Sequence, residues 1–197
     1  MPVKSQEIPP SAAQAMQEAR PWAEIEEMAV RPVQETFALE GAEPGLPSHP
    51  IYYLSLLELT TSRSFERALL TGWRRVTHER GAAWSVAVEH APDRSFRFAS
   101  RYPVGALERR LSRLDSLRAL VPEVDECELR AIGIPPLMEL AVWLQFESDK
   151  RNLVIPIHTC SRSLAAGRAY TDAQVIDALM EPARSLLGFS PGLPPAR

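Results

Sequence analysis

Residues 137–158 read LMELAVWLQFESDKRNLVIPIH, and this stretch decides the fold class of the chain. In its first half, apolar side chains occupy alternate positions, at Met138, Leu140, Val142, Leu144 and Phe146. Six polar residues follow at 147–152, and a second alternation then runs through Leu153, Ile155 and Ile157. Because side chains on a strand point alternately to the two faces of a sheet, the pattern predicts a β-hairpin with one apolar face.

The register of this hairpin follows from its apolar face, since a slip of one residue would expose that face. A turn around residues 149–150 pairs the apolar residues as Phe146–Leu153, Leu144–Ile155 and Val142–Ile157. On the opposite face, the same register sets Trp143 across from Pro156. Proline has no backbone N–H to donate, so residues 153–158 are expected to form an edge strand.

Two other regions upstream also have strand patterns. Residues 82–90 and 95–102 predict a second hairpin, with the pairs Val88–Phe98, Val86–Ser100 and Trp84–Tyr102. Its other face sets Glu89 across from Arg97, which is a favourable cross-strand pair. Residues 128–135 predict one more strand, which Pro135 and Pro136 end.

Three segments have the spacing of amphipathic helices. Residues 62–80 carry the stripe Phe65, Leu69, Trp73 and Val76, and residues 104–120 carry the stripe Leu107, Leu111, Leu114 and Leu117. Residues 171–187 begin with capping-box spacing at Thr171 and Gln174, and their inward positions are Val175, Leu179, Ala183 and Leu186. Residues 51–59 fit either a buried strand or the first turns of a helix, and their β-favouring start favours the strand.

These elements predict an α+β fold with a mostly antiparallel sheet of five to six strands. About three helices are expected to cover one face of that sheet. Residues 1–48 are expected to be an acidic, partly disordered N-terminal segment with a helix near 11–30, which forms an appendage that either packs on the domain or recruits a partner. Residues 51–190 are expected to form a single domain, and residues 191–197 are a tail.

The bulk composition is ordinary for one globular domain, with 197 residues, 45% hydrophobic and 24% charged. The sequence contains no run of eighteen apolar residues and no apolar signal core at its start, which indicates a cytoplasmic protein without a membrane partner. The two cysteines, Cys127 and Cys160, do not make a disulfide framework. Glycine-rich phosphate loops and common hydrolase motifs are absent, so no cofactor and no metal are expected.

The net charge of −3 hides a basic block. Residues 63–118 carry 12 basic and 6 acidic groups, whereas residues 1–62 carry 3 basic and 9 acidic groups. Two predicted helices carry the arginines that form a candidate site for an anion or a nucleic acid: Arg63, Arg67, Arg74 and Arg75 on the first, and Arg109, Arg110 and Arg113 on the second. The favoured interpretation is a solvated helix face that neutralises the acidic N-terminal segment.

His158 and Cys160 are the only reactive pair that the predicted strands bring together. Residues two apart on a strand share a face, so the imidazole and the thiol are candidates for a nucleophilic pair, with Glu139 expected across from Cys160. The favoured interpretation is a small buried cysteine beside a surface histidine. A structural zinc needs four ligands, and the spacing of the remaining cysteine and histidines matches no metal motif.

No motif in the sequence demands a particular chemistry. The leading hypothesis is therefore a non-enzymatic cytoplasmic interaction or accessory protein, with a protein partner or with self-association. The first alternative is an anion- or nucleic-acid-binding protein that uses the arginines of residues 63–118. The second alternative is an enzyme built on Cys160 and His158.

Overall fold

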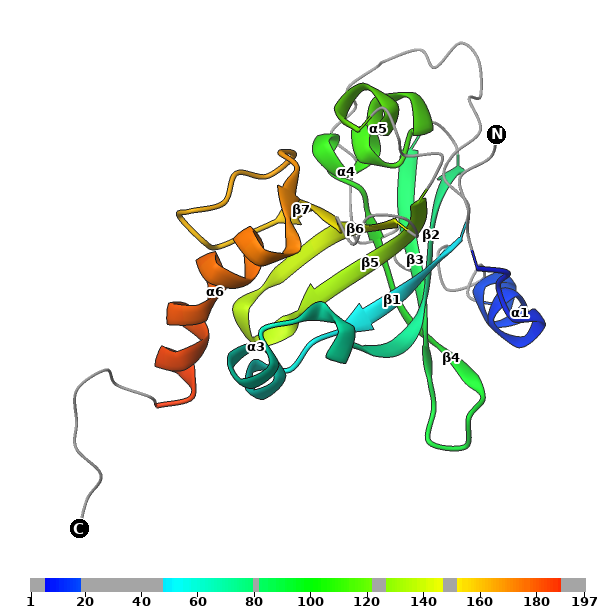
Figure 1. Cartoon of the computed structure of the whole chain (residues 1–197). Helices are drawn as coiled ribbons and strands as arrows, with labels where there is room; N and C mark the ends of the chain where they lie inside the picture. The colour runs from blue at the N-terminus through cyan, green and yellow to red at the C-terminus, as the bar shows by residue number, and fades with distance from the viewer. Residues whose placement is uncertain (1–5, 19–47, 80–81, 122–126, 147–151, 189–197) are drawn as a thin grey trace.

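The computed structural model describes residues 6–18, 48–79, 82–121, 127–146 and 152–188 (Figure 1). Within these residues the chain forms one mixed sheet of eight strands, in the order β4-β3-β2-β1-β5-β6-β7-β8. The strands are β1 (His49–Tyr53), β2 (Leu69–Glu79), β3 (Ala82–His90), β4 (Phe96–Pro103), β5 (Cys127–Ile134), β6 (Glu139–Phe146), β7 (Leu153–His158) and β8 (Tyr170–Thr171). The helices are α1 (Pro10–Glu18), α3 (Leu56–Ser62), α4 (Ala106–Leu111), α5 (Leu114–Leu120) and α6 (Asp172–Leu186), with 3-10 segments η1 (Phe65–Arg67) and η3 (Pro135–Leu137).

Two antiparallel meanders meet at β1 in the middle of the sheet. Strands β2, β3 and β4 form the first meander, and β5, β6, β7 and β8 form the second. Strand β1 pairs antiparallel with β2 and parallel with β5, and every other pairing between the described strands is antiparallel. The prediction of a mostly antiparallel α+β fold is therefore correct, but the expected five to six strands were too few.

Helices lie on both faces of the second meander, so the expectation of helices on one face is wrong. Trp143 and Val142 are neighbours on β6 and point to opposite faces. Segments α3, η1 and α6 pack on the Trp143 face, whereas α4 and α5 pack on the Val142 face (Figure 1). All four residues from Ala141 to Leu144 are buried, which requires a cover on both sides.

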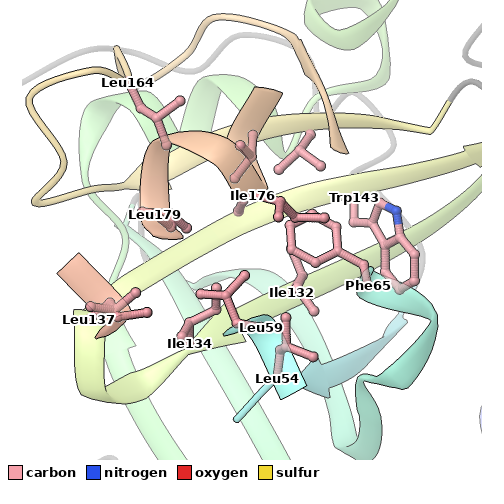
Figure 2. Close-up of a cluster of buried hydrophobic side chains, with 14 of the residues drawn as sticks. Leu54, Leu59, Phe65, Ile132, Ile134, Leu137, Trp143, Leu164, Ile176 and Leu179 are labelled. Atoms are coloured by element: carbon pink, nitrogen blue, oxygen red, sulfur yellow. The ribbon is translucent and has the colours of Figure 1, made fainter. Parts of the chain in front are cut away.

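The Trp143 face holds the largest apolar cluster (Figure 2). The Trp143 indole meets Tyr52 edge-on at a ring-centroid distance of 5.6 Å and Phe65 at 5.9 Å. Leu54 and Leu59 reach the cluster from the β1–α3 segment, while Ile176 and Leu179 reach it from α6. Aromatic pairs in this geometry add about 0.5–1.5 kcal/mol beyond the area they bury.

The predicted helix at 62–80 is wrong, because residues 69–79 form the 11-residue strand β2. Helix α3 ends at the C-cap Arg63, which has a left-handed φ of 51°, and only 65–67 continue as a 3-10 turn. The first part of β2 pairs with β1 as far as Arg74, and β3 pairs with β2 from Gly72 to Glu79. That ladder overrides the helical spacing of the apolar residues. The ambiguous segment 51–59 is strand only as far as Tyr53, and α3 begins at Leu56 after the Ser55 cap.

The predicted helix at 104–120 is interrupted. Its two parts are α4 and α5, and Arg113 between them has an extended conformation with φ −103° and ψ 126°. The Ser112 hydroxyl donates to the Arg109 carbonyl at 2.8 Å, a local bond of the kind that competes with a continuous helix. Leu111 and Leu117 of the predicted stripe are nevertheless buried on the Val142 face.

Both predicted hairpins form, but their registers are partly wrong. Strands β3 and β4 pair Val88 with Phe98 and Glu89 with Arg97 as predicted. A shift at Ala87/Val88 then pairs Val86 with Arg101 and Trp84 with Pro103, because a bulge on β4 adds one residue.

Strands β6 and β7 pair with a register two residues away from the prediction. The pairs are Leu144–Leu153, Val142–Ile155, Trp143–Val154 and Ala141–Pro156. A shift of two keeps each side chain on its predicted face, which is why the face pattern could not detect it. Strand β7 is also not the outermost strand, but β8 pairs only with Leu153 and Val154 and stops short of Pro156.

Helix α1 packs on the first meander. Its Ala12, Ala15 and Met16 are buried against Trp73, Val86 and Val88. Residues 10–18 therefore belong to the folded body. The sequence left open whether the N-terminal appendage packs on the domain or recruits a partner, and these residues pack on the domain. The rest of the helix expected near 11–30 lies outside the described residues, as do residues 1–5, 31–47 and the tail at 191–197.

Helix α6 begins with the predicted capping box. The Thr171 hydroxyl accepts from the Gln174 backbone N–H at 3.3 Å, and the Gln174 side chain accepts from the Thr171 N–H at 2.9 Å. Val175, Leu179 and Ala183 are buried as predicted. Leu186 was expected to face inward, but it is 59% exposed because it lies in the last turn of the helix.

Replacing Thr171 with Ala removes the side-chain cap and leaves a helix N–H without its acceptor. We expect the free energy of unfolding to fall by about 1 kcal/mol, measured by urea denaturation. Thr61→Ala on α3 is the control, because the Thr61 hydroxyl bonds only a carbonyl of its own helix. An equal loss in both variants would contradict a specific role for the cap.

Candidate functional site

The predicted pair His158 and Cys160 is exposed at the end of β7 and in the loop that follows. Cys160 was expected to be buried, and it is not. Glu139 lies across from this loop as expected, and its Oε1 accepts from the Thr159 hydroxyl at 2.8 Å and from the Cys160 N–H at 2.9 Å. The carboxylate therefore holds the backbone of the loop. Within the described part of the chain, no hydrogen bond joins the imidazole of His158 to the thiol of Cys160.

The predicted arginines do not share one surface. Arg63 caps α3 and pairs with Asp177 of α6, and Arg67 lies in η1. Arg74 and Arg75 are neighbours on β2, so their side chains point to opposite faces of the sheet. Arg109, Arg110 and Arg113 are exposed at the end of α4 and just after it. The predicted arginines therefore do not form a single patch, because residues 69–79 are a strand and not a helix.

Arg74 lies inside a polar network on the same face as α4. Its exposed fraction is 4%, and that of its ion-pair partner Glu108 is 8%. Its Nε donates to the Ser85 hydroxyl at 2.7 Å, and its Nη2 donates to the Tyr102 hydroxyl at 3.0 Å. The Arg74 charge is therefore satisfied from within the fold, and the network joins α4 to three strands of the first meander.

Removing Glu108 would leave the Arg74 charge buried without its partner. We expect Glu108→Ala to lower the free energy of unfolding by about 3–5 kcal/mol, and the double variant Arg74→Met/Glu108→Leu to recover much of that loss. The control is Arg97→Ala, which breaks the exposed pair with Glu89 and should cost less than about 1 kcal/mol. Urea denaturation measures all three, and equal effects at Glu108 and Arg97 would contradict a buried pair.

The Trp143 face carries a row of polar and aromatic side chains that crosses the middle of the sheet. Trp73 is opposite Pro50, and the β1–β5 register places Pro50 beside Arg130, which is opposite Trp143. Glu128 and Gln145 form the next pair along β5 and β6. We call this set the indole strip: Trp73, Thr77, Glu128, Arg130, Trp143 and Gln145.

Each member of the indole strip has a buried polar atom without a hydrogen-bond partner. The donors are the indole N–H groups of Trp73 and Trp143 and the Nε of Arg130. The acceptors are Glu128 Oε1 and Gln145 Oε1, and the Thr77 hydroxyl can act as either. A buried polar group without a partner costs about 1–3 kcal/mol, and folded proteins contain few of them. Their concentration on one face therefore calls for an explanation.

Arg130 organises the centre of the indole strip. Its guanidinium lies over the rings of Tyr52 and Trp143, with centroid distances of 4.9 Å and 5.0 Å. Its Nη2 pairs with Glu128 Oε2 at 2.7 Å, which leaves Oε1 of that carboxylate unpartnered. Stacking and ion pairing hold the guanidinium in place, so Nε is presented in a fixed direction.

Sequence reasoning missed the indole strip because it assigned both tryptophans to the core. They are 3% and 2% exposed, so the core assignment is correct, but it did not predict that their buried N–H groups would have no hydrogen-bond partner. A signal was present in the strand patterns. Glu128 and Arg130 alternate with Leu129 and Ala131 along β5. The strand therefore has apolar side chains on one face and a row of charged side chains on the opposite face.

A second surface feature is an exposed apolar end of the sheet. Tyr53 is opposite Leu69, and Tyr52 is opposite Leu70. Burial raises the pKa of the Tyr53 hydroxyl, and the Glu89 carboxylate adds to that shift. The Tyr53 ring lies against Gly133, where an added Cβ would come within 2.9 Å of it. Large exposed side chains gather here, and we call them the apolar end: Tyr53, Leu57, Leu69, Leu70 and Met138.

Other kinds of site have no support in the part of the chain that the structure describes. No group of three or more His, Cys, Asp or Glu side chains there could hold a metal ion. None of the described helices is long and apolar enough to cross a membrane.

Comparison with known proteins returns no match to a family model, to a curated protein or to a solved structure. The functional conclusion therefore depends on the geometry of this chain alone.

Proposed function

We propose that the chain is a non-enzymatic interaction or accessory protein that binds a protein partner through the apolar end. The observation that carries this proposal is the exposure of large apolar side chains from several segments at one end of the sheet. Leu69 is 72% exposed, Met138 is 62% exposed and Leu57 is 57% exposed. Groups of exposed apolar residues on a folded domain mark interaction surfaces more often than isolated ones do.

The backbone supports the same conclusion at Met138. This residue has a left-handed φ of 54° in the turn between β5 and β6. A glycine would adopt this conformation with less strain, since it has no Cβ. Methionine instead places a flexible apolar side chain at the tip of the turn, a residue type suited to irregular binding surfaces.

Burial of this surface supplies the driving force for association. Each square ångström of apolar surface removed from water contributes about 25 cal/mol. Burying the side chains of Leu69 and Met138 in a partner would contribute about 1.5–3 kcal/mol each. Partner binding through the apolar end therefore requires no charge and no cofactor.

Charged substitutions in the apolar end test the proposal. Leu69→Asp/Met138→Asp should abolish co-purification of partner proteins from the native host, because a carboxylate would have to be desolvated at the contact. Ala119→Asp, an exposed position on α5, is the control and should keep those partners. Quantitative mass spectrometry of cross-linked samples compares the three proteins, and light scattering reports whether the lost partner is a second copy of the chain. The proposal would be contradicted if the wild-type chain, the double variant and the control all co-purified the same partner proteins.

The second candidate function is anion or nucleic-acid binding, which one observation favours. Arg109 and Arg110 are exposed side by side on α4, while the adjacent Glu108 carboxylate is turned inward to Arg74. The local acid therefore does not neutralise these guanidinium groups at the surface. Arginine binds phosphate through paired N–H groups.

Binding of this kind weakens steeply as salt rises, since each phosphate contact releases counterions. We expect a 20-nucleotide single-stranded DNA to bind at low salt, and Arg109→Ala/Arg110→Ala to weaken it by about tenfold, which is about 1.4 kcal/mol. Fluorescence anisotropy measures both, with Arg184→Ala on α6 as the control. No binding at low salt would remove this candidate.

A further inference from the structure

We propose that the indole strip is a binding site for an extended, acidic polypeptide segment of a partner protein. This site is separate from the apolar end and does not depend on the function proposed for it. Two observations carry it together. The first is that the strip gathers unpartnered polar atoms on one face of the sheet. The second is that two of these atoms belong to Trp73 and Trp143, which are only 3% and 2% exposed.

The direction of the Trp143 indole supports a site rather than a packing defect. Figure 2 shows its nitrogen at the outer side of the apolar cluster, turned away from Leu54 and Leu137. The carbon part of the ring contacts Tyr52 and Phe65 and is fully used in the core. The N–H is therefore presented at the border between the core and the polar part of the strip.

Access to these atoms runs through side chains that are themselves partly exposed. The side chains of Arg130 and Glu128 are 15% and 23% exposed, and Thr77, Gln145 and Arg75 are half-buried. The unpartnered atoms themselves are buried, so a ligand reaches them only when neighbouring, partly exposed side chains move aside. The strip lies between α1, which packs near Trp73, and η1, which packs near Trp143.

The chemistry of the strip selects a peptide backbone. Its N–H donors are complementary to carbonyl oxygens, and its oxygen acceptors are complementary to backbone N–H groups. A phosphate has no N–H group to donate to the acceptors Glu128 Oε1 and Gln145 Oε1, and a metal ion would find indole N–H groups that offer no lone pair. Only a ligand that both donates and accepts satisfies the whole set.

The spacing of the strip favours an extended segment. Trp73 and Trp143 stand on β2 and β6, three strand spacings apart across β1 and β5. At about 4.8 Å per spacing, the indoles are about 14 Å apart, which an extended peptide of about four residues spans. Such a segment would cross the strands and present its carbonyl and N–H groups alternately to the row beneath it.

Arg75 indicates the charge of the segment. It lies on the same face of β2 as Trp73 and Thr77, two residues from each. Within the described residues, its guanidinium makes no hydrogen bond and no ion pair. The half-buried cation is therefore available to a carboxylate of the ligand, whereas the charge of Arg130 is already shared with Glu128.

The test begins with a displayed library of random 12-residue peptides, selected on the full-length chain. Enriched peptides should carry Asp or Glu, and isothermal titration should give them a measurable dissociation constant. Thr77→Val and Gln145→Leu remove unpartnered atoms while keeping the shape of the side chain, and each should weaken the peptide five- to tenfold. Arg75→Gln should weaken acidic peptides by a similar factor.

The matched control lies on the same strand. The Thr71 hydroxyl already donates to the Ile51 carbonyl at 3.2 Å, so Thr71→Val should leave the peptide affinity unchanged. Leu69→Asp/Met138→Asp should also leave it unchanged, which separates this site from the apolar end. In urea denaturation of the free chain, Thr77→Val and Gln145→Leu should cost no stability, because the atoms they remove bond nothing in the fold.

The proposal is overturned if no peptide is enriched, or if enriched peptides bind Thr77→Val and Gln145→Leu as tightly as the wild-type chain. It is also overturned if a single-stranded DNA or RNA 20-mer binds and is weakened by these two substitutions while the peptides are not. In that case the strip reads nucleobase edges, which also both donate and accept.

Discussion

Burial of β6 on both faces is the constraint on which the rest of the fold depends. Trp143 lies under η1 and α3 on one side, while its neighbours Val142 and Leu144 lie under α4 and α5 on the other. Each large apolar side chain contributes about 1.5–3 kcal/mol on burial, so neither face can be left open without a large loss. The helices therefore have to divide between the faces, although a one-sided arrangement would satisfy a simple antiparallel sheet.

The position of β1 follows from the same constraint. Its parallel pairing with β5 requires a long connection, and the chain uses that connection to build β2, β3, β4, α4 and α5. The pair Arg74–Glu108 then joins α4 to the first meander, while α4 and α5 contribute Leu111 and Leu117 to the cluster on β5 and β6. The two meanders thus share one pair of helices, and the buried ion pair fixes where those helices sit.

The polar groups inside the fold divide into two kinds. Those around Arg74 are partnered by Ser85, Tyr102 and Glu108, so their role is complete within the chain. Those of the indole strip are shielded from water and have atoms that bond nothing. Desolvation without a partner is unfavourable, and a ligand that supplies the missing bonds recovers that cost. This physical difference, and not the residue types alone, distinguishes a structural network from a candidate binding site.

The sequence by itself determined the strands at 128–135 and in the two hairpins, the capping box of α6 and the mostly antiparallel class of the sheet. Those features depend on the alternation of apolar and polar side chains along a strand and on contacts between residues three positions apart. A single short segment of sequence contains all of that information. Only the tertiary structure decided that residues 69–79 are a strand, that β6 and β7 pair two residues away from the face-based register, and that Arg74 and Arg75 point to opposite faces. Each of these three features depends on hydrogen bonds to the backbone of a strand that is distant in the sequence. The candidate site depends on the same long-range pairing, because Trp73 and Trp143 are 70 positions apart in the sequence and share a row only through β1 and β5.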